Sequence, residues 1–455
     1  MTVSARLAEF TVRTRLEDCP PATLIAVRRA ALDTLGVTLA GAGEPVAQIL
    51  RRVLRAEGGG GPPLCTIVGT RARASTTAAA LANGAAGHAH DFDDTNFTLM
   101  GHPSVPLLAA SLATAEAAMS DGAGVALAYI VGFEVGAALG AALNPIHYER
   151  GWHATSSIGS LACAAAVAKI LGLDVTATRT ALGIAASLAS GLKENFGSMT
   201  KPFHAGHAAR NGVWAALLAR EGLSAADTAL EGKQGYFAAF GGAGDLGRAG
   251  EGLGQRWQLL ESGIAVKPYP SCALTHATID ALLELRDTHR FDPDQVAHVE
   301  VGVTRVVPPV LLHTHPATGL ERKFSMQFCA AAALVDGRVD LDSFEDGPPA
   351  PAIEKLMPRI SMVVDRALPD QREQHAWSRI TIQLSDGRVI ASPPRGAQGH
   401  PDHPLSDRAL RDKFLACASR VLPLEEAEAV ADQIADLEHI PDIRALTSRL
   451  AADND

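Results

Sequence analysis

The sequence predicts a mainly α-helical protein, with a large all-helical domain and a smaller α+β domain inserted into it. At 455 residues the chain is too long for one compact core. Apolar residues make up 47% of the chain but aromatic residues only 5%, so Ala, Leu and Val supply the core, which favours closely packed helices. Alternating apolar and polar residues, typical of strands, begin after about Lys267. We therefore expect a helical domain over 1–265, an α+β lid domain over 266–399, and a return to the helical domain over 400–455.

The first half of the chain consists of helical patterns separated by Gly and Pro. Residues 22–55 predict a helical pair interrupted at "GAGEP", and 62–70 predict a connector or short strand. Apolar residues at helical spacing predict further helices at 75–90, 102–119, 121–143, 157–172, 176–192 and 205–222. The Gly-rich stretches 58–63 and 241–254 are expected to be loops.

One apolar stretch, Val125 to Leu143, is long enough to cross a membrane. It has Glu134 near its centre and consists mostly of Ala and Gly, which give little side-chain hydrophobicity. We therefore expect a buried helix of a soluble bundle and no membrane partner.

The second domain combines a helix with several strand patterns. A helix is expected over 271–289, and strands over 295–307, 359–368 and in the hairpin 378–394, where Asp386-Gly387 supplies the turn. After a loop at 396–404, the helical pattern returns at 405–422.

The charge and the cysteines exclude several protein classes. The formal net charge of -10, without a basic stripe, argues against nucleic acid as a partner. The six cysteines form no Cys-x-x-Cys pair, so neither a disulfide framework nor a thiolate zinc site is expected. No secretory h-region opens the chain, and a cytoplasmic location is expected. Nucleotide fingerprints and the Gly-x-Ser-x-Gly elbow of serine hydrolases are also missing from the sequence.

Four polar clusters interrupt the apolar pattern. The densest is "HAHDFDDTNFTLMGHPS" at 88–104, which by itself suits a metal site, an acid/base site or a polar capping loop. In the second, "ERGWHATSSIGS", His153 precedes a Ser/Thr run able to cap a helix at about Ser157. The third places Lys201, His204 and His207 at a loop-to-helix junction, where a lysine, histidines and free N–H groups suit an anion. The fourth, "AVKPYPSCALTHATID", places Lys267 and His276 in the expected seam between the domains.

In this order and at these separations, the motifs "HAHDFDDT", "GHPS", "GWHAT", "KPFHAGHAA" and "KPYPSC" resemble the MmgE/PrpD family. That family includes 2-methylcitrate dehydratases, cis-aconitate decarboxylases and iminodisuccinate epimerases. The resemblance covers nearly the whole chain and implies a cofactor-free, metal-free enzyme, usually a homodimer, whose cleft lies between a large helical domain and a smaller α+β lid. It implies that the cleft is lined by Asp91, Thr95, His102, His153, Lys201 and Lys267.

This set of residues suits proton removal, or loss of carbon dioxide, next to a carboxylate. Lys201 and Lys267 would stabilise the negative charge that builds on carboxylate oxygens. A histidine would move the proton, with His102 as the principal acid or base and His153 as its partner. Asp91 would orient an imidazole, and we expect substrate contacts from Thr95, His204, His207, Cys272 and His276. For Cys272, a buried structural thiol is the alternative.

Two positions depart from the family pattern. Many relatives have Tyr where this chain has Phe328, and Arg or Lys where it has His207. The main expectation is a dehydratase-type lyase acting on a small di- or tricarboxylate, with an epimerase of a dicarboxylate or a decarboxylase of a cis-aconitate-like acid as alternatives. A metal-dependent hydrolase using the His/Asp cluster, or a catalytically silent carboxylate-binding protein, would belong to other classes.

Overall fold

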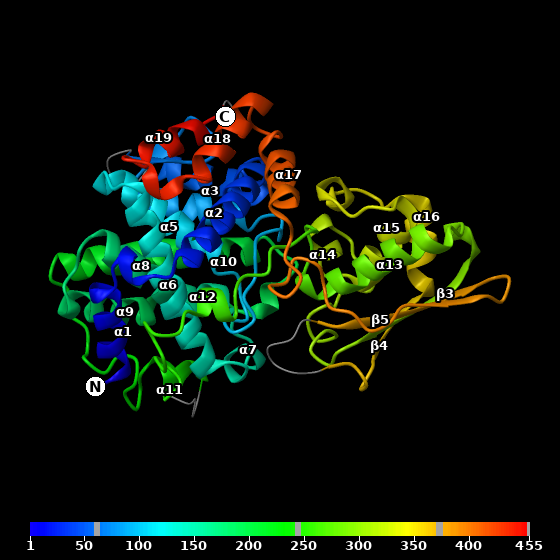
Figure 1. Ribbon diagram of the computed structural model, residues 1–455, viewed down its shortest axis with the longest axis horizontal. Coiled ribbons are helices and arrows are strands. Elements are labelled where there is room, and N and C mark those ends of the chain that lie inside the picture. Colours follow the sequence, from blue (N-terminus) through cyan, green and yellow to red (C-terminus); the bar gives the residue numbers. More distant parts are fainter. Residues whose placement is uncertain (59–63, 242–246, 370–375, 453–455) are drawn as a thin grey trace.

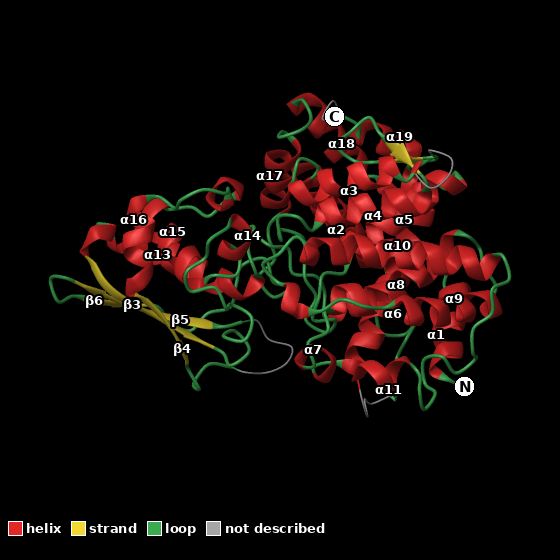
Figure 2. Ribbon diagram, turned by 180° about the vertical axis from the view of Figure 1, so that it is seen from behind, coloured by secondary structure: helices red, strands yellow, loops and turns green. Residues whose placement is uncertain are grey.

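The computed structural model describes residues 1–58, 64–241, 247–369 and 376–452. Figures 1 and 2 show a large helical body that contains both ends of the chain, joined to a smaller body of helices and one sheet. The expected mainly helical fold, with strands confined mostly to the second half, is therefore confirmed.

The helical body is built from long helices of the N-terminal half and from the C-terminal helices. Its longer members are α1 (Val3–Arg13), α2 (Pro21–Gly41), α3 (Pro45–Ala56), α4 (Thr76–Gly87), α5 (Ser104–Ala118), α6 (Gly122–Leu143), α8 (Ala154–Ile170), α9 (Val175–Leu188), α10 (Thr200–Arg220), α17 (Asp407–Ala418) and α18 (Leu424–Ile434). Its short elements are β1 (Cys65–Thr66), β2 (Arg73–Ala74), α7 (Ile146–Glu149), α11 (Tyr236–Gly241), α12 (Gln258–Glu261) and α19 (Arg444–Thr447).

One hydrophobic core joins the two ends of the chain. Leu7 of α1, Phe414 of α17 and Leu446 of α19 are fully buried in the same cluster as the apolar residues of α5, α6 and α8. Many of these side chains are alanines, so the helix axes approach closely, as the low aromatic content predicts. The C-terminal helices are thus part of the structure that supports the first half of the chain (Figure 1).

Helix α6 is the only described helix long and apolar enough to span a membrane. In the structure 89% of its most apolar window is buried among other helices, as expected. The Glu134 carboxylate accepts the backbone N–H groups of Gln258 and Leu259, both at 2.9 Å. The buried carboxyl group of this helix therefore caps the start of α12.

The smaller body is a four-stranded sheet covered by helices on one face (Figure 2). Its strands β3 (Val296–Val303), β4 (Ile360–Val364), β5 (Ser378–Leu384) and β6 (Val389–Ala391) lie in the order β4-β3-β5-β6. Its helices are α13 (His276–His289), α14 (Gly319–Arg322), α15 (Met326–Asp336) and α16 (Pro351–Leu356). Strands β3 and β4 are parallel and the other pairs antiparallel, so the chain crosses over between β3 and β4 through α14 to α16.

Several expectations for single elements need correction. Helix α8 begins at Ala154, not near Ser157, because the Ser157 hydroxyl donates to the His153 carbonyl inside the helix instead of capping its end. Helix α4 ends at Gly87, so the histidines of "HAH" follow it. Helix α15 was not predicted, because its alanine run lacks an amphipathic pattern. The hairpin turn at Gly387, where φ is 89°, is as expected. Parts of the two Gly-rich stretches, 59–63 and 242–246, lie outside the described residues.

Candidate active site

The polar loop that connects α4 to α5 is buried, although loops usually lie on the surface. The backbone of Thr95 pairs with that of Ala265 in both directions, at 2.7 and 2.9 Å. The Asn96 side chain donates to the Gly263 carbonyl at 2.7 Å and accepts from the Leu99 N–H at 2.7 Å. These bonds fix the loop against the segment that leads into Lys267, so motifs about 170 residues apart in the numbering meet.

Helices α4 and α10 bring the loop to Lys201. An added Cβ at Gly84 would lie 2.7 Å from the Gly206 Cα, and one at Gly206 would lie 2.1 Å from the Leu81 carbonyl oxygen. The two backbones can approach this closely only because side chains are missing there. As a result, Lys201 in the first turn of α10 faces His88, which directly follows α4.

The Asp91 carboxylate contacts the ammonium groups of two lysines. The Lys201 Nζ donates to the Asp91 Oδ1 at 2.6 Å, and the Lys267 Nζ lies 3.2 Å from the same oxygen. Lys267 also donates to the Asp91 backbone carbonyl at 2.6 Å. Burial alone would raise the pKa of the Asp91 carboxyl, but the two lysines outweigh it and hold that pKa well below its usual range. Asp91 is therefore a carboxylate that neutralises one of two buried ammonium groups.

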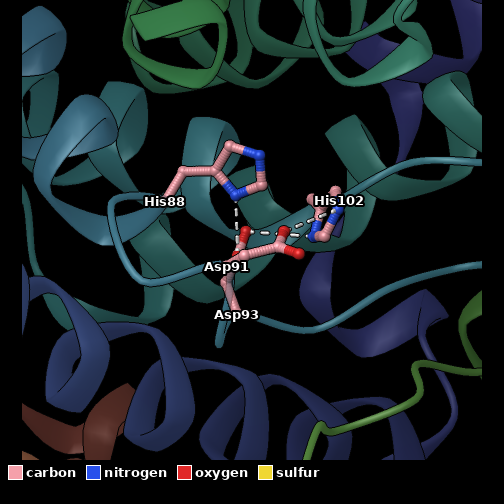
Figure 3. A group of neighbouring side chains, drawn as sticks. All are labelled: His88, Asp91, Asp93 and His102. Atoms are coloured by element: carbon pink, nitrogen blue, oxygen red, sulfur yellow. Dashed lines mark hydrogen bonds and ion pairs between the residues drawn. The ribbon is translucent and has the colours of Figure 1, made fainter. Parts of the chain in front are cut away.

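Two histidines flank the carboxylate of Asp93 (Figure 3). The His88 Nδ1 donates to the Asp93 Oδ1 at 2.7 Å, because its Nε2 accepts from Lys201 at 2.9 Å. His102 places its Nδ1 3.3 Å from the Asp93 Oδ2 and its Nε2 3.7 Å from the Asp91 Oδ1. Burial lowers the pKa of His102, while Asp93 opposes that shift. Both ring nitrogens of His102 thus face a carboxylate, whereas His88 faces a carboxylate with one ring nitrogen and a lysine with the other.

His153 and His204 form a second pair beside the first. Their Nδ1 atoms are 3.0 Å apart, and the His153 ring centroid lies 6.4 Å from that of His102. Burial, followed by Lys201 and the other histidines, lowers the pKa of His153 well below its usual value. The Thr155 hydroxyl accepts the His102 backbone N–H at 2.9 Å, which connects the loop to the start of α8. His153 is therefore held as a neutral imidazole next to His102.

The other predicted substrate contacts are less close to this centre. Thr95, Lys267 and His276 line one small cavity, and the buried Thr95 hydroxyl has no hydrogen-bond partner among the described residues. Cys272 is half-buried, and burial and the nearby Asp91 raise its thiol pKa to about 11. The His207 Nε2 lies 3.1 Å from the Ser190 hydroxyl, and its ring stacks on Phe203.

The structure also shows the contacts of Phe328 and of the aspartates in the loop between α4 and α5. Phe328 is buried in the core of the smaller body, with its ring 5.7 Å from that of Phe344. Asp94 bonds the Ser104 hydroxyl and N–H at the start of α5. The motifs did not lead us to place His88 and Asp93 among the site residues, yet both contact the central groups directly.

The arrangement bears on whether a metal could bind. Ligand atoms of His88, Asp91, Asp93 and His102 all lie within 4.8 Å of one another, as metal ligands would. However, the Lys201 ammonium already contacts both Asp91 and His88. A second cation there would face this buried positive charge, so the donor set fits an ammonium-carboxylate-imidazole cluster better than a metal.

Fold and site together define a two-domain, mainly helical protein with a buried cluster of lysine, aspartate and histidine. A model of the MmgE/PrpD N-terminal domain matches residues 5–249, and one of the MmgE/PrpD C-terminal domain matches residues 269–439. The chain belongs to the MmgE/PrpD family, as its motifs predicted.

Relatives of known name are similar over most of their length. The cis-aconitate decarboxylase-like protein oryM of Aspergillus oryzae is 28% identical over 99% of this chain and 98% of its own. The cis-aconitate decarboxylase of Mus musculus is 31% identical over 83% of this chain and 79% of its own. That of Aspergillus terreus is 26% identical over 98% of this chain and 96% of its own. These names favour the decarboxylase alternative and give no support to the expected dehydratase.

Proposed function

We propose that this protein is a cofactor-independent lyase that removes carbon dioxide from a cis-aconitate-like tricarboxylate. The observation that carries the proposal is the buried pair of ammonium groups on Asp91, with His102 beside it. The names of the similar proteins supply the substrate class. The activity replaces the dehydratase that the motifs alone led us to expect.

The chemistry of such an acid explains why these groups suit it. In a β,γ-unsaturated acid, the electron pair of the breaking C–C bond forms a new double bond as carbon dioxide leaves. The old double bond shifts its pair to the carbon next to another carboxylate, whose oxygens gain charge. Lys201 and Lys267 are fixed cations in a buried site, where they stabilise that developing charge without reorganising.

One proton must then reach the new carbanionic carbon. His102 fits this role, because Asp93 favours its imidazolium form against burial, Lys267 and Lys201, and Asp91 lies 3.7 Å from its Nε2. A bound tricarboxylate adds negative charge and favours that form further. His153 has no carboxylate partner of its own among the described residues and pairs with His204, so we assign it to holding the substrate and excluding water. The proton that His102 gives up is replaced from solvent after carbon dioxide leaves.

The experiment is an NMR assay in deuterium oxide with cis-aconitate, methylcitrate, citrate, iminodisuccinate and tartrate. We expect carbon dioxide release from cis-aconitate, and one deuterium at the carbon that becomes saturated. Dehydration of citrate or methylcitrate without decarboxylation would reject the proposal in favour of the dehydratase. Exchange or inversion of iminodisuccinate alone would favour the epimerase. If no substrate exchanges or reacts, the protein is a silent carboxylate binder.

Metal analysis of the same preparation tests the remaining class. A metal in stoichiometric amount, with activity lost to a chelator, would support the metal-dependent hydrolase and reject the proposed chemistry. We also propose that the protein is a homodimer in the cytoplasm; light scattering of the purified protein and localisation of the tagged chain test these two points.

A further inference from the structure

Three consecutive peptide carbonyls of the buried loop each accept a hydrogen bond from a lysine. The Lys323 Nζ lies 2.9 Å from the carbonyl oxygen of His90, and the Lys267 Nζ lies 2.6 Å from that of Asp91. The Lys413 Nζ lies 2.8 Å from that of Phe92. These lysines come from separate segments, since Lys323 follows α14, Lys267 precedes α13 and Lys413 lies in α17.

Neither Lys323 nor Lys413 has a place in the chemistry derived above, yet Lys323 is buried and the side chain of Lys413 is only 7% exposed. Lys323 is 3% exposed, and both of its hydrogen-bond acceptors are carbonyls, the second being that of Pro270 at 3.1 Å. Burial lowers the pKa of this lysine to about 8. Lys413 lies 2.5 Å from the buried Asp33 carboxylate and 3.8 Å from the Phe92 ring centroid. Burying an ammonium group is costly, so two of them directed at one loop need an explanation.

The backbone conformation of Asp91 explains why these lysines are directed at the loop. Its φ of 52° lies in the left-handed region, which residues other than glycine adopt only uncommonly. The His90 carbonyl belongs to the peptide plane before Asp91, and the Asp91 carbonyl to the plane after it. The lysine hydrogen bonds that fix both peptide planes therefore also fix the φ and ψ angles of Asp91. The Phe92 carbonyl belongs to the plane before Asp93, so Lys413 fixes the next step of the chain in the same way.

We propose that Lys323 and Lys413 are positioning residues, which act through the His90 and Phe92 carbonyls to aim the Asp91 and Asp93 carboxylates. Lys323 holds Asp91 toward Lys201, and Lys413 holds Asp93 toward His88 and His102. The effect on turnover rests on the proposed function, whereas the effect on the loop does not.

The test replaces each lysine by methionine, which keeps the length of the side chain and removes the charge and donor. Lys169→Met is the matched control, because the Lys169 Nζ also donates to a backbone carbonyl, that of Val12 at 2.8 Å, away from the loop. Since Lys413→Met leaves Asp33 without its ion-pair partner, Asp33→Asn/Lys413→Met is made alongside it to keep the charges balanced.

Two measurements are made on each full-length variant. Hydrogen-deuterium exchange followed by mass spectrometry reports on peptides covering 88–104, and steady-state kinetics with cis-aconitate report on turnover. In Lys323→Met and in the double variant we expect faster exchange in 88–104. We also expect kcat to fall about 10- to 100-fold, the cost of misplacing catalytic groups, with KM changed much less. Lys169→Met should show neither effect.

The two readouts separate the possible failures. Unchanged exchange in 88–104 would overturn the proposal whatever the kinetics, and faster exchange with wild-type kcat would show that the lysines hold the loop without aiming its carboxylates. If the wild-type protein does not decarboxylate cis-aconitate, the proposed function fails, and the exchange measurement still decides whether the lysines hold the loop.

Discussion

Replacing Lys201 by methionine should remove most of the attraction of the site for a substrate carboxylate. Lys201 and Lys267 both contact Asp91, so these three side chains together carry one net positive charge. Without Lys201 the remaining pair is neutral. A charge at roughly 4 Å, with an effective dielectric constant near 20, is worth about 4 kcal/mol. We therefore expect kcat/KM to fall on the order of a thousandfold.

The assay is steady-state decarboxylation of cis-aconitate, with folding checked by circular dichroism. Lys355→Met is the control, because Lys355 forms an exposed ion pair with Asp294 at 2.8 Å, and pairs of that kind contribute little. Lys201→Met leaves Asp91 paired with Lys267, so no buried charge loses its partner and the variant should remain folded. A folded Lys201→Met enzyme with kcat/KM within a few-fold of wild type would refute the assignment of this ammonium to the substrate.

Three other changes test separate parts of the structure. His102→Gln should lower kcat by about 10²–10⁴, the usual contribution of a general acid; full activity in the folded variant would contradict that role. Burial, then the nearby Asp33, raises the pKa of Asp94 to about 8, so the folded state holds this proton more tightly than the unfolded state. Its contribution to stability is therefore lost as pH rises from about 4 through about 8, and the urea midpoint of Asp94→Asn should decline less over that range than that of wild type. Gly206→Ala should lower stability by about 1–3 kcal/mol, because its Cβ would lie 2.1 Å from the Leu81 carbonyl oxygen, whereas Gly43→Ala, with nothing within 4 Å, should melt as wild type does.

The motif residues of the site could be found from the sequence, because clusters of charged residues and histidines are unusual in such an apolar chain. Lys201, Lys267, Asp91 and His102 were all predicted to act together, and the structure brings them into contact. His88 was underestimated, since no pattern in one sequence says which of several neighbouring histidines faces a lysine.

Lys413 could not have been found from the sequence. It lies in an ordinary amphipathic helix, where a lysine normally points to solvent, and only the packing of α17 onto α2 turns it toward the loop. Lys323 stands three residues before Met326 in the sequence segment that leads into α15, and its neighbours likewise give no hint of its carbonyl acceptors. Tertiary contacts decide both cases.

The bond from Lys413 to the Phe92 carbonyl also bears on how the protein is made. Phe92 is added to the growing chain 321 residues before Lys413. During that interval, at the usual 5–20 residues per second, the loop lacks at least one of its three lysines, and Asp33 lacks its ion-pair partner. The site therefore matures only when the C-terminal helices join the body that was synthesised first.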